Sequence, residues 1–362
     1  MEDRGIEAGQ LDPEDCASRI FNYSGKKIDP ETASALWAKI LTHKRYLSEK
    51  LERDVSVKVA CVDFIENMDL SGSSLEKEES LIFLREYGAQ MVNGSVWDTI
   101  SDTQPPKQMV QKRIILPLTE IELALKHGVS PPRAIIFFGP PGTGKTHFVR
   151  AIAGVLKWYY IEVSPSSLMV DGEERLGANL KTLMESVRGI DEAVVFIDEF
   201  EEIAGSRDQA SRIDKSITNE FLKQIPLFKA RDRSNLLVCA TNYISQLDTA
   251  LLRPGRFDCI IPVGNLDNHS RQTIFEHYLA TTNHSNVDVD AIIPTIEHFT
   301  PADIEYLFQK VRQESFEREF AMGEDYKVTT EPFVEMISKV RPTLNDEIIR
   351  EFEEDCAKYT RL

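Results

Sequence analysis

The stretch GPPGTGKT, Gly139 to Thr146, combines glycines, a lysine and a threonine at the spacing of a phosphate-binding loop. Glycines let the backbone curl so that its N–H groups point at phosphate oxygens, and the positive end of a following helix adds to that field. Lys145 would neutralise β- and γ-phosphate oxygens, and the Thr146 hydroxyl would ligate Mg²⁺. The apolar run AIIFF precedes the loop and the helical stretch HFVRAIAGVL follows it, which is the required context. The predicted nucleotide-binding residues are Gly139, Pro140, Pro141, Gly142, Thr143, Gly144, Lys145, Thr146 and His147, with an exposed or packed helix residue as the alternative for His147.

A second apolar run, AVVFI, ends in two carboxylates, Asp198 and Glu199. In a parallel sheet the carboxyl ends of the strands form the edge at which ligands bind. Asp198 is therefore expected to hold Mg²⁺ through water, and Glu199 to orient and polarise an attacking water. A pair of acidic residues after a strand also serves as a helix N-cap, and that remains the alternative.

Polar residues follow two further parts of the chain. Asn242 comes directly after the apolar run LLVCA and would bring its amide beside the attacking water; its alternative is the start of a turn. In LLRPGRFD, Arg253 and Arg256 flank a Pro-Gly turn that holds them in a fixed bend. A guanidinium grips phosphate oxygens well, so these arginines predict a phosphate contact, with solvated surface arginines as the alternative.

Elements of two kinds must position these residues. Continuous apolar runs separated by helical stretches indicate a parallel sheet that is covered on both faces. From Asn265 onward the pattern is helical only. The pattern therefore predicts an α/β fold, in which an N-terminal helical arm precedes a core with a parallel sheet and a helical C-terminal subdomain follows it. The predicted strands are 134–138, 159–163, 193–197, 236–240 and 259–263.

The helical arm is the least defined part of this prediction. Apolar residues recur at helical spacing over 31–67, and a second helix is expected from about 75 to 92, before Asn-Gly at 93–94. The arm either docks a partner or is a self-contained packing element. The predicted organisation is a flexible N-terminus at 1–30, the arm at 31–95, the α/β nucleotide-binding core at 96–264 and the α-helical C-terminal subdomain at 265–362.

The composition narrows the class of protein. The chain has 362 residues, 42% of them hydrophobic and 28% charged, as in an ordinary globular protein. The net charge of −17 argues against nucleic acid and anionic membrane as partners. The five cysteines are scattered without metal-ligand spacing, and no run is apolar enough for a signal peptide or a membrane span. A cytoplasmic protein is expected.

Taken together, GPPGTGKT, VVFIDE, CATN and LDTALLRPGRFD resemble the AAA clade of the AAA+ ATPases, the group that contains the proteasomal ATPases, katanin and spastin. The similarity covers roughly 96–362. It implies that the α/β core is a P-loop NTPase fold with a Rossmann-like core, that the C-terminal subdomain is an α-helical lid, and that the N-terminal helical arm lies outside the match. It implies ATP and Mg²⁺ as ligands, a homo-oligomeric ring, usually of six subunits, and a sensor 1 role for Asn242. It also implies that Arg253 and Arg256 reach the neighbouring subunit's ATP, and that Tyr278 and Ala302 lie near the nucleotide. Arg207 aligns with a boundary arginine, with a solvated loop residue as the equal alternative.

This sequence departs from its relatives in two segments. Threading members carry an aromatic residue in the pore loop, but the corresponding stretch 165–185 has none; the position falls on Val170, Asp171 or Gly172. Met169 and Val170 would grip a client weakly or pack in the core. The stretch 225–235, IPLFKARDRSN, replaces a Met-Asp-Gly segment that helps relay nucleotide state, so coupling is expected to run differently.

The expected function is a ring-forming ATPase that couples ATP hydrolysis to remodelling or disassembly of a protein client or complex, the client or adaptor being unidentified. The alternative is an ATP-dependent assembly scaffold or switch whose slow hydrolysis acts as a timer, without threading. A nucleic-acid remodeller is the third possibility and lacks a basic patch.

Overall fold

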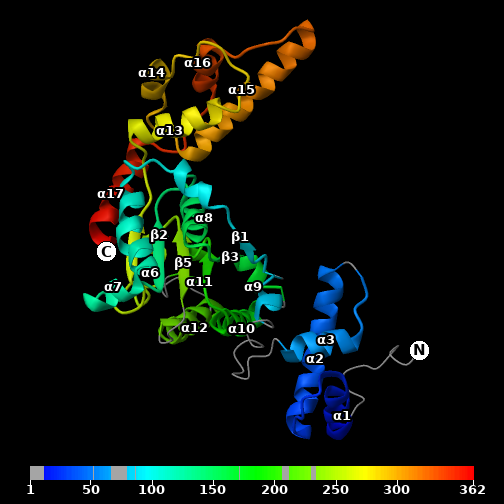
Figure 1. Ribbon diagram of the computed structural model, residues 1–362. Coiled ribbons are helices and arrows are strands. Elements are labelled where there is room, and N and C mark those ends of the chain that lie inside the picture. Colours follow the sequence, from blue (N-terminus) through cyan, green and yellow to red (C-terminus); the bar gives the residue numbers. More distant parts are fainter. Residues whose placement is uncertain are drawn as a thin grey trace. The chain divides into compact units, whose positions relative to one another are not determined.

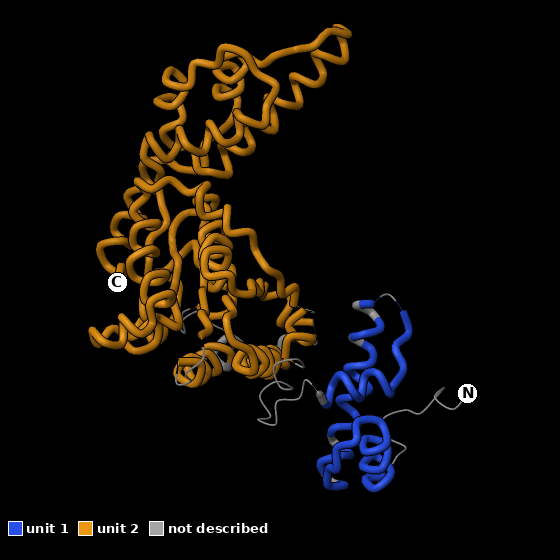
Figure 2. The backbone as a smooth tube through the Cα atoms, in the orientation of Figure 1, with its two compact units in different colours: residues 1–79 blue, residues 80–362 orange. Residues whose placement is uncertain are grey.

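The computed structural model describes residues 12–51, 53–66, 80–85, 87–170, 172–205, 212–229 and 234–362. The chain forms two compact units, residues 1–79 and 80–362 (Figure 2), and each is described by itself.

In the described residues of the first unit, three helices pack around an apolar core. Helices α1 (Pro13–Ser24), α2 (Pro30–Lys50) and α3 (Val57–Glu66) bury Ile20 and Trp37, among others. The flexible segment predicted for 1–30 is therefore wrong for α1. The Asp12 carboxylate caps this helix by accepting from the Asp15 N–H at 2.8 Å, and burial of Ile20 attaches it to the core. The continuous helical pattern over 31–67 is divided by the residues between α2 and α3.

The boundary between the units lies after residue 79, earlier than the predicted boundary after 95. Residues 80–85 are helical, and Leu84 is buried in the core of the second unit. The helix predicted for 75–92 ends here because Gly88 takes a left-handed conformation with φ 76°. Strand β1 (Gln90–Met91) follows and pairs antiparallel with β3. Its two residues carry too little pattern to be predicted.

A six-stranded sheet with the order β1-β3-β4-β5-β2-β6 forms the centre of the second unit (Figure 1). All pairs except β1 with β3 are parallel. The predicted parallel sheet is thereby confirmed. The bounds are β2 (Ala134–Phe138), β3 (Tyr159–Val163), β4 (Ala193–Ile197), β5 (Asn235–Thr241) and β6 (Cys259–Pro262).

Both faces of the sheet are buried because every residue of β2 is apolar and alternate residues point to opposite sides. Ile136 packs in a core with α10 (Leu176–Gly189) and α12 (Arg212–Lys229). Phe137 packs in a second core with α8 (Lys145–Leu156). The same face is covered by α5 (Pro105–Val110), η2 (Gln111–Ile115) and α6 (Leu116–Thr119).

The lid has its own core, formed by α13 (Asn268–Leu279), α14 (Val289–Ile292), η5 (Ile293–Ile296), α15 (Pro301–Met322) and α16 (Thr330–Lys339). Helix α17 (Asp346–Tyr359) packs elsewhere, since its Phe352 and Tyr359 contact the core of the α/β sheet. The segment predicted as lid, 265–362, therefore divides between two cores.

The second unit also contains several short elements. They are η1 (Gly94–Thr99), α7 (Ile121–Lys126), α9 (Pro165–Leu168), η3 (Glu173–Arg175), α11 (Glu201–Ala204) and η4 (Ile244–Gln246).

None of the helices in the described ranges is long and apolar enough to cross a membrane.

Candidate nucleotide-binding site

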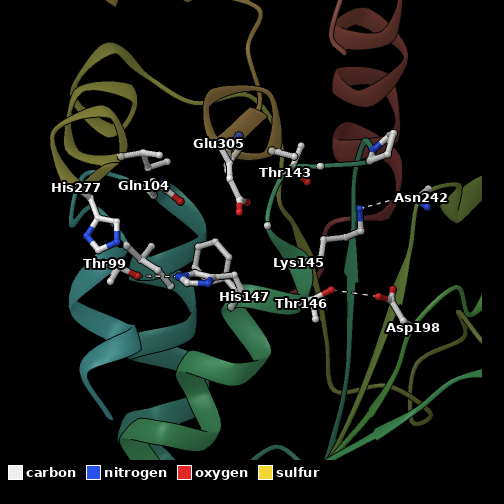
Figure 3. A pocket seen from close by; sticks show the side chains of 18 of the residues that line it. Thr99, Gln104, Thr143, Lys145, Thr146, His147, Asp198, Asn242, His277 and Glu305 are labelled. Atoms are coloured by element: carbon white, nitrogen blue, oxygen red, sulfur yellow. Dashed lines mark hydrogen bonds between the residues drawn. The ribbon is translucent and has the colours of Figure 1, made fainter. Parts of the chain in front are cut away.

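A cavity of about 470 Å³ lies where the carboxyl ends of the strands meet the lid, and its side chains come from core and lid alike (Figure 3). Gly139, Pro140, Arg253 and Arg256 do not border it. The residues that were predicted from sequence and line it are Pro141, Gly142, Thr143, Gly144, Lys145, Thr146, His147, Asp198, Glu199, Asn242, Tyr278 and Ala302.

The loop after β2 needs glycine at two close approaches. Gly139 has φ 147°, and a Cβ there would lie 2.1 Å from the Val263 carbonyl oxygen. Gly142 has φ 75°, and a Cβ there would lie 2.8 Å from Thr300 Oγ1 on the lid. The loop therefore folds tightly against β6 and the lid before α8 begins, with the positive end of α8 at the cavity.

Lys145 is buried and its ammonium group has three acceptors. It donates to the Gly139 carbonyl at 2.8 Å, the Pro140 carbonyl at 2.9 Å and Asn242 Oδ1 at 2.8 Å. Burial lowers the pKa of Lys145 to about 8, although the Asp198 and Glu201 carboxylates act in the opposite direction. Gly139 and Pro140 thus contribute to the site through Lys145.

The Thr146 hydroxyl donates to Asp198 Oδ2 at 3.1 Å, which joins the first turn of α8 to the end of β4 (Figure 3). Among the described residues no group of three His, Cys, Asp or Glu side chains could hold a metal ion. A hydroxyl beside one carboxylate fits Mg²⁺, because this ion takes few protein oxygens and completes its shell with phosphates and water.

Glu199 is exposed and has a positive φ of 49°, which is uncommon for a residue with a side chain. The nearby carboxylate of Glu202 raises the pKa of Glu199, followed by burial and by Asp198 and Glu201. Asn242 is held separately, since its backbone N–H donates to Glu201 Oε1 at 3.1 Å. The two candidate catalytic residues therefore border one cavity from adjacent strands.

The other end of the cavity is lined by residues that sequence reasoning missed. Thr99 and Gln104 enter from the segment before β2, and Glu305 enters from α15 (Figure 3). Thr99 Oγ1 lies 2.7 Å from His147 Nε2, and burial lowers the pKa of His147, as do Arg150 and His277. Burial raises the pKa of Tyr278, as does its hydrogen bond to Glu305. Thr99, Gln104 and Glu305 have no motif spacing that would have revealed them.

The lid reaches the phosphate loop at the start of α15. The Ala302 N–H donates to the Gly142 carbonyl at 3.4 Å. The Thr300 side chain and Asp303 form a capping box, and Asp303 Oδ1 also accepts from the Thr343 hydroxyl at 2.7 Å. The first turn of α15 is therefore fixed where it contacts the loop.

The two arginines precede β6, whose Cys259 pairs with Ile135 near the start of β2, at the end of the strands opposite the phosphate loop. Arg253 is exposed. Arg256 Nη1 donates to the Leu222 carbonyl in α12. Pro226 stands four residues later in that helix and has no N–H, so the Leu222 carbonyl lacks its intrahelical partner and is free to accept from Arg256. Arg207 and Asp171 lie outside the described residues.

Residues 135–265 match the family described as "ATPase family associated with various cellular activities (AAA)". The chain contains an AAA ATPase domain. This domain spans the phosphate loop, both carboxylates, Asn242 and the arginines, so the resemblance inferred from the sequence is confirmed.

The similarity to known proteins extends beyond residues 135–265. The chain is 27% identical over 299 residues to the Cell division cycle protein 48 homolog of Archaeoglobus fulgidus, covering 78% of this chain and 41% of that protein. It is 32% identical over 221 residues to the probable 26S proteasome regulatory subunit 10B of Caenorhabditis elegans, covering 58% and 53%. With proteasome-activating nucleotidase 1 of Haloferax volcanii the identity is 28% over 309 residues, covering 83% and 72%. The chain thus spans about half or less of two of these relatives.

The fold also matches solved structures. The crystal structure of the FIGL-1 AAA domain superposes with a TM-score of 0.66 at 23% identity, covering 76% of this chain and 93% of that one. The structure of the same domain in complex with ADP gives a TM-score of 0.65 at 24% identity, covering 76% and 94%. The predicted P-loop NTPase fold is confirmed.

Proposed function

We propose that the protein is an ATPase that forms a homo-oligomeric ring, expected to be hexameric, and uses hydrolysis to remodel or disassemble a protein complex. The observation that carries this proposal is the cavity itself, where Lys145 contacts Asn242 and Thr146 contacts Asp198, with Glu199 beside them. ATP fits this arrangement of a glycine loop, a lysine and a helix N-terminus. The ADP complex of the FIGL-1 AAA domain supports nucleotide as the ligand.

Each residue near the phosphates has a distinct role in this proposal. Thr146 and Asp198 hold Mg²⁺, which when bound neutralises phosphate charge. Lys145 binds the β- and γ-phosphates, and Asn242 positions the ammonium group of Lys145 and the attacking water. Glu199 orients and polarises that water.

In this proposal Arg253 and Arg256 of a second copy of the chain complete the ATP site. Within one chain these arginines lie at the end of the strands opposite the phosphate loop, so they serve the ATP of a neighbouring subunit. An arginine supplied in this way contributes about 10³ to 10⁵ in rate. A single subunit therefore hydrolyses ATP slowly, and assembly activates it.

The segment 165–185, which corresponds to the pore loop of threading relatives, bears on whether a client is threaded. Val170 is 80% exposed, and residues 165–185 include no aromatic side chain. An aliphatic side chain offers less contact area to a client than an aromatic one, so disassembly without processive threading is favoured. The same observation supports the second candidate, an ATP-dependent assembly scaffold or switch whose slow hydrolysis acts as a timer. The relatives named for the proteasome support a protein rather than a nucleic acid as client.

A Glu199→Gln variant tests the proposed function. It keeps the phosphate contacts of Lys145 and Thr146, so it should bind fluorescent ATP with an affinity within about twofold of wild type while turnover falls by at least about 10²-fold. Affinity purification with ATP should then retain a client that the wild-type protein releases.

The matched control is Lys145→Ala, which should bind neither nucleotide nor client. The proposed remodelling function is wrong if Glu199→Gln retains no protein beyond those found with Lys145→Ala. The role assigned to Glu199 is wrong if Glu199→Gln turns over ATP as fast as wild type.

A further inference from the structure

We propose that Arg361 and Lys229 are positioning residues that clamp the arginine loop, residues 251–258, in the shape that presents Arg253 and Arg256 to the neighbouring subunit. This inference rests on the proposed trans role of these arginines. Neither clamping residue borders the nucleotide cavity or belongs to a recognised motif.

Arg361 holds the loop on both sides of the arginine pair. Its Nη1 donates to the Leu252 carbonyl at 2.8 Å, immediately before Arg253, and its Nη2 donates to the Phe257 carbonyl at 2.6 Å, immediately after Arg256. The rigid fork of a guanidinium suits two separate acceptors, and a hydrogen bond from a charged donor is stronger than one from a neutral donor. One side chain therefore fixes the distance between the two ends of the arginine segment.

Arg361 is itself firmly anchored. Its backbone N–H donates to the Ile260 carbonyl at 3.0 Å, and its carbonyl accepts from the Ile260 N–H at 2.7 Å. It follows α17, whose Phe352 ring lies 5.9 Å from the ring of Phe138. A Cβ on Gly264 would lie 1.9 Å from Phe352 Cε1, so the helix is seated closely against the sheet edge. The clamp is therefore built on the core.

Lys229 holds the middle of the loop from the end of α12. Its ammonium group donates to the Gly255 and Arg256 carbonyls, each at 3.2 Å, and to Asp258 Oδ1 at 2.5 Å. Asp258 Oδ2 in turn accepts from the Arg133 N–H at 2.7 Å, at the start of β2. Two cationic side chains from different elements thus bind four carbonyls of one exposed turn.

These contacts would position Arg253 and Arg256 rather than bind nucleotide. The turn carries two cations and includes Gly255, which adopts a φ of 92° and, because it lacks a Cβ, has wide conformational freedom. An error of about 1 Å in a catalytic group costs on the order of 10²-fold in rate. Loss of the clamp should therefore lower kcat and leave nucleotide affinity unchanged.

Three variants of the full chain separate this role from general stability. Arg361→Ala and Lys229→Met should each lower kcat by about 10- to 100-fold, with the dissociation constant for fluorescent ATP within about twofold of wild type. Arg361→Lys keeps the charge but lacks the two separate nitrogens with which Arg361 reaches the Leu252 and Phe257 carbonyls, so its kcat should lie between those of Arg361→Ala and wild type. The matched control is Arg350→Ala, an exposed arginine on α17, which should behave as wild type.

Mixed oligomers supply the decisive measurement. A Glu199→Gln subunit turns over ATP at least about 10²-fold more slowly than wild type but presents correctly placed arginines, whereas an Arg361→Ala subunit has an intact pocket and displaced arginines. ATPase activity is measured with Arg361→Ala at fixed concentration and increasing Glu199→Gln. The same titration with Arg256→Ala in place of Arg361→Ala calibrates the trans effect.

Activity per Arg361→Ala subunit should rise at least about fivefold on mixing, as it should for Arg256→Ala. If Arg256→Ala is rescued and Arg361→Ala is not, the clamp is rejected while the trans arginine stands. If neither variant is rescued, the trans arginine is rejected and the clamp with it. Equal loss of nucleotide binding and kcat in Arg361→Ala would also overturn the inference.

Discussion

The charge on Lys145 sets how the phosphate site responds to pH. Burial lowers the pKa of this side chain from 10.5 to about 8. Below pH 8 the side chain is charged in both the folded and the unfolded protein, and burial of this charge opposes folding. That cost falls as the pH rises from about 8 toward 10.5, because the folded protein loses the proton first. Phosphate binding, in contrast to folding, is favoured by the charged form of Lys145, since only the charged ammonium attracts phosphate oxygens.

ATP affinity should therefore fall as the pH rises through about 8, by up to about tenfold per pH unit, because binding must then take up a proton. The measurement is the dissociation constant of fluorescent ATP between pH 6.5 and 9.5 at fixed ionic strength. Lys145→Arg is the control, because a guanidinium stays charged throughout this range. An affinity that stays constant across the range for the wild-type protein would contradict the lowered pKa.

Arg256 gives the second prediction at this scale. Arg256→Ala should bind ATP with an affinity within about twofold of wild type and lose about 10³-fold or more in turnover, because the residue is absent from the cavity of its own chain. Steady-state ATPase assays combined with nucleotide titration check this. An undiminished rate would reject the trans arginine.

Residues in local motifs were predictable from sequence, since a strand, a glycine loop and a helix follow one another within about 20 positions. Thr99, Gln104 and Glu305 were not, because their place in the cavity depends on how the lid and the segment before β2 pack. The Leu222 carbonyl, which accepts from Arg256, could not be predicted from sequence either. The stretch 225–235, which contains Pro226, was identified as a departure from relatives, but Arg256 and its acceptor Leu222 are 34 residues apart in sequence.

Pro226 in helix α12 illustrates the element scale. Proline inside a helix costs about 3 kcal/mol relative to alanine, less near a helix end. It also frees the Leu222 carbonyl, which accepts from Arg256. Pro226 therefore lowers the stability of the helix but leaves the Leu222 carbonyl available to hold Arg256 in place.

Pro226→Ala should stabilise the protein by about 1 to 3 kcal/mol yet lower kcat several-fold, because the backbone N–H that this substitution restores would compete with Arg256 for the Leu222 carbonyl. Thermal unfolding and steady-state ATPase assays of the same preparation check both directions. A more stable protein with unchanged kcat would show that this hydrogen bond has no role in turnover.

Element type was predictable where the pattern was long and pure. The five buried strands of the core were identified because each is almost wholly apolar. Strand β1 was read as helix, since its two residues follow a helix that ends only through the left-handed Gly88. Helix α1 was missed because its sequence is polar apart from a few residues that pack on α2.

At the scale of the whole molecule, each of the two units has its own core. The sequence predicted separate parts but placed their boundary too late, because residues 80–91 belong to the sheet through Leu84 and β1. Nucleotide binding should therefore need only the second unit.

A fragment of residues 80–362 should fold and bind fluorescent ATP with an affinity within about threefold of the full chain, since every residue lining the cavity lies within it. A client that the Glu199→Gln full chain retains but the same variant of the fragment loses would assign the first unit to client recruitment. Loss of ATP binding in a folded fragment would contradict the independence of the two units.

The shared catalytic site is the central claim, and ATP turnover per subunit across a dilution series with Mg²⁺, measured together with the molar mass by light scattering, tests it most directly. Turnover per subunit should fall as the oligomer dissociates and should reach about 10³-fold below its plateau for the monomer. A protein that stays monomeric and hydrolyses ATP at the same brisk rate at every concentration would contradict the claim.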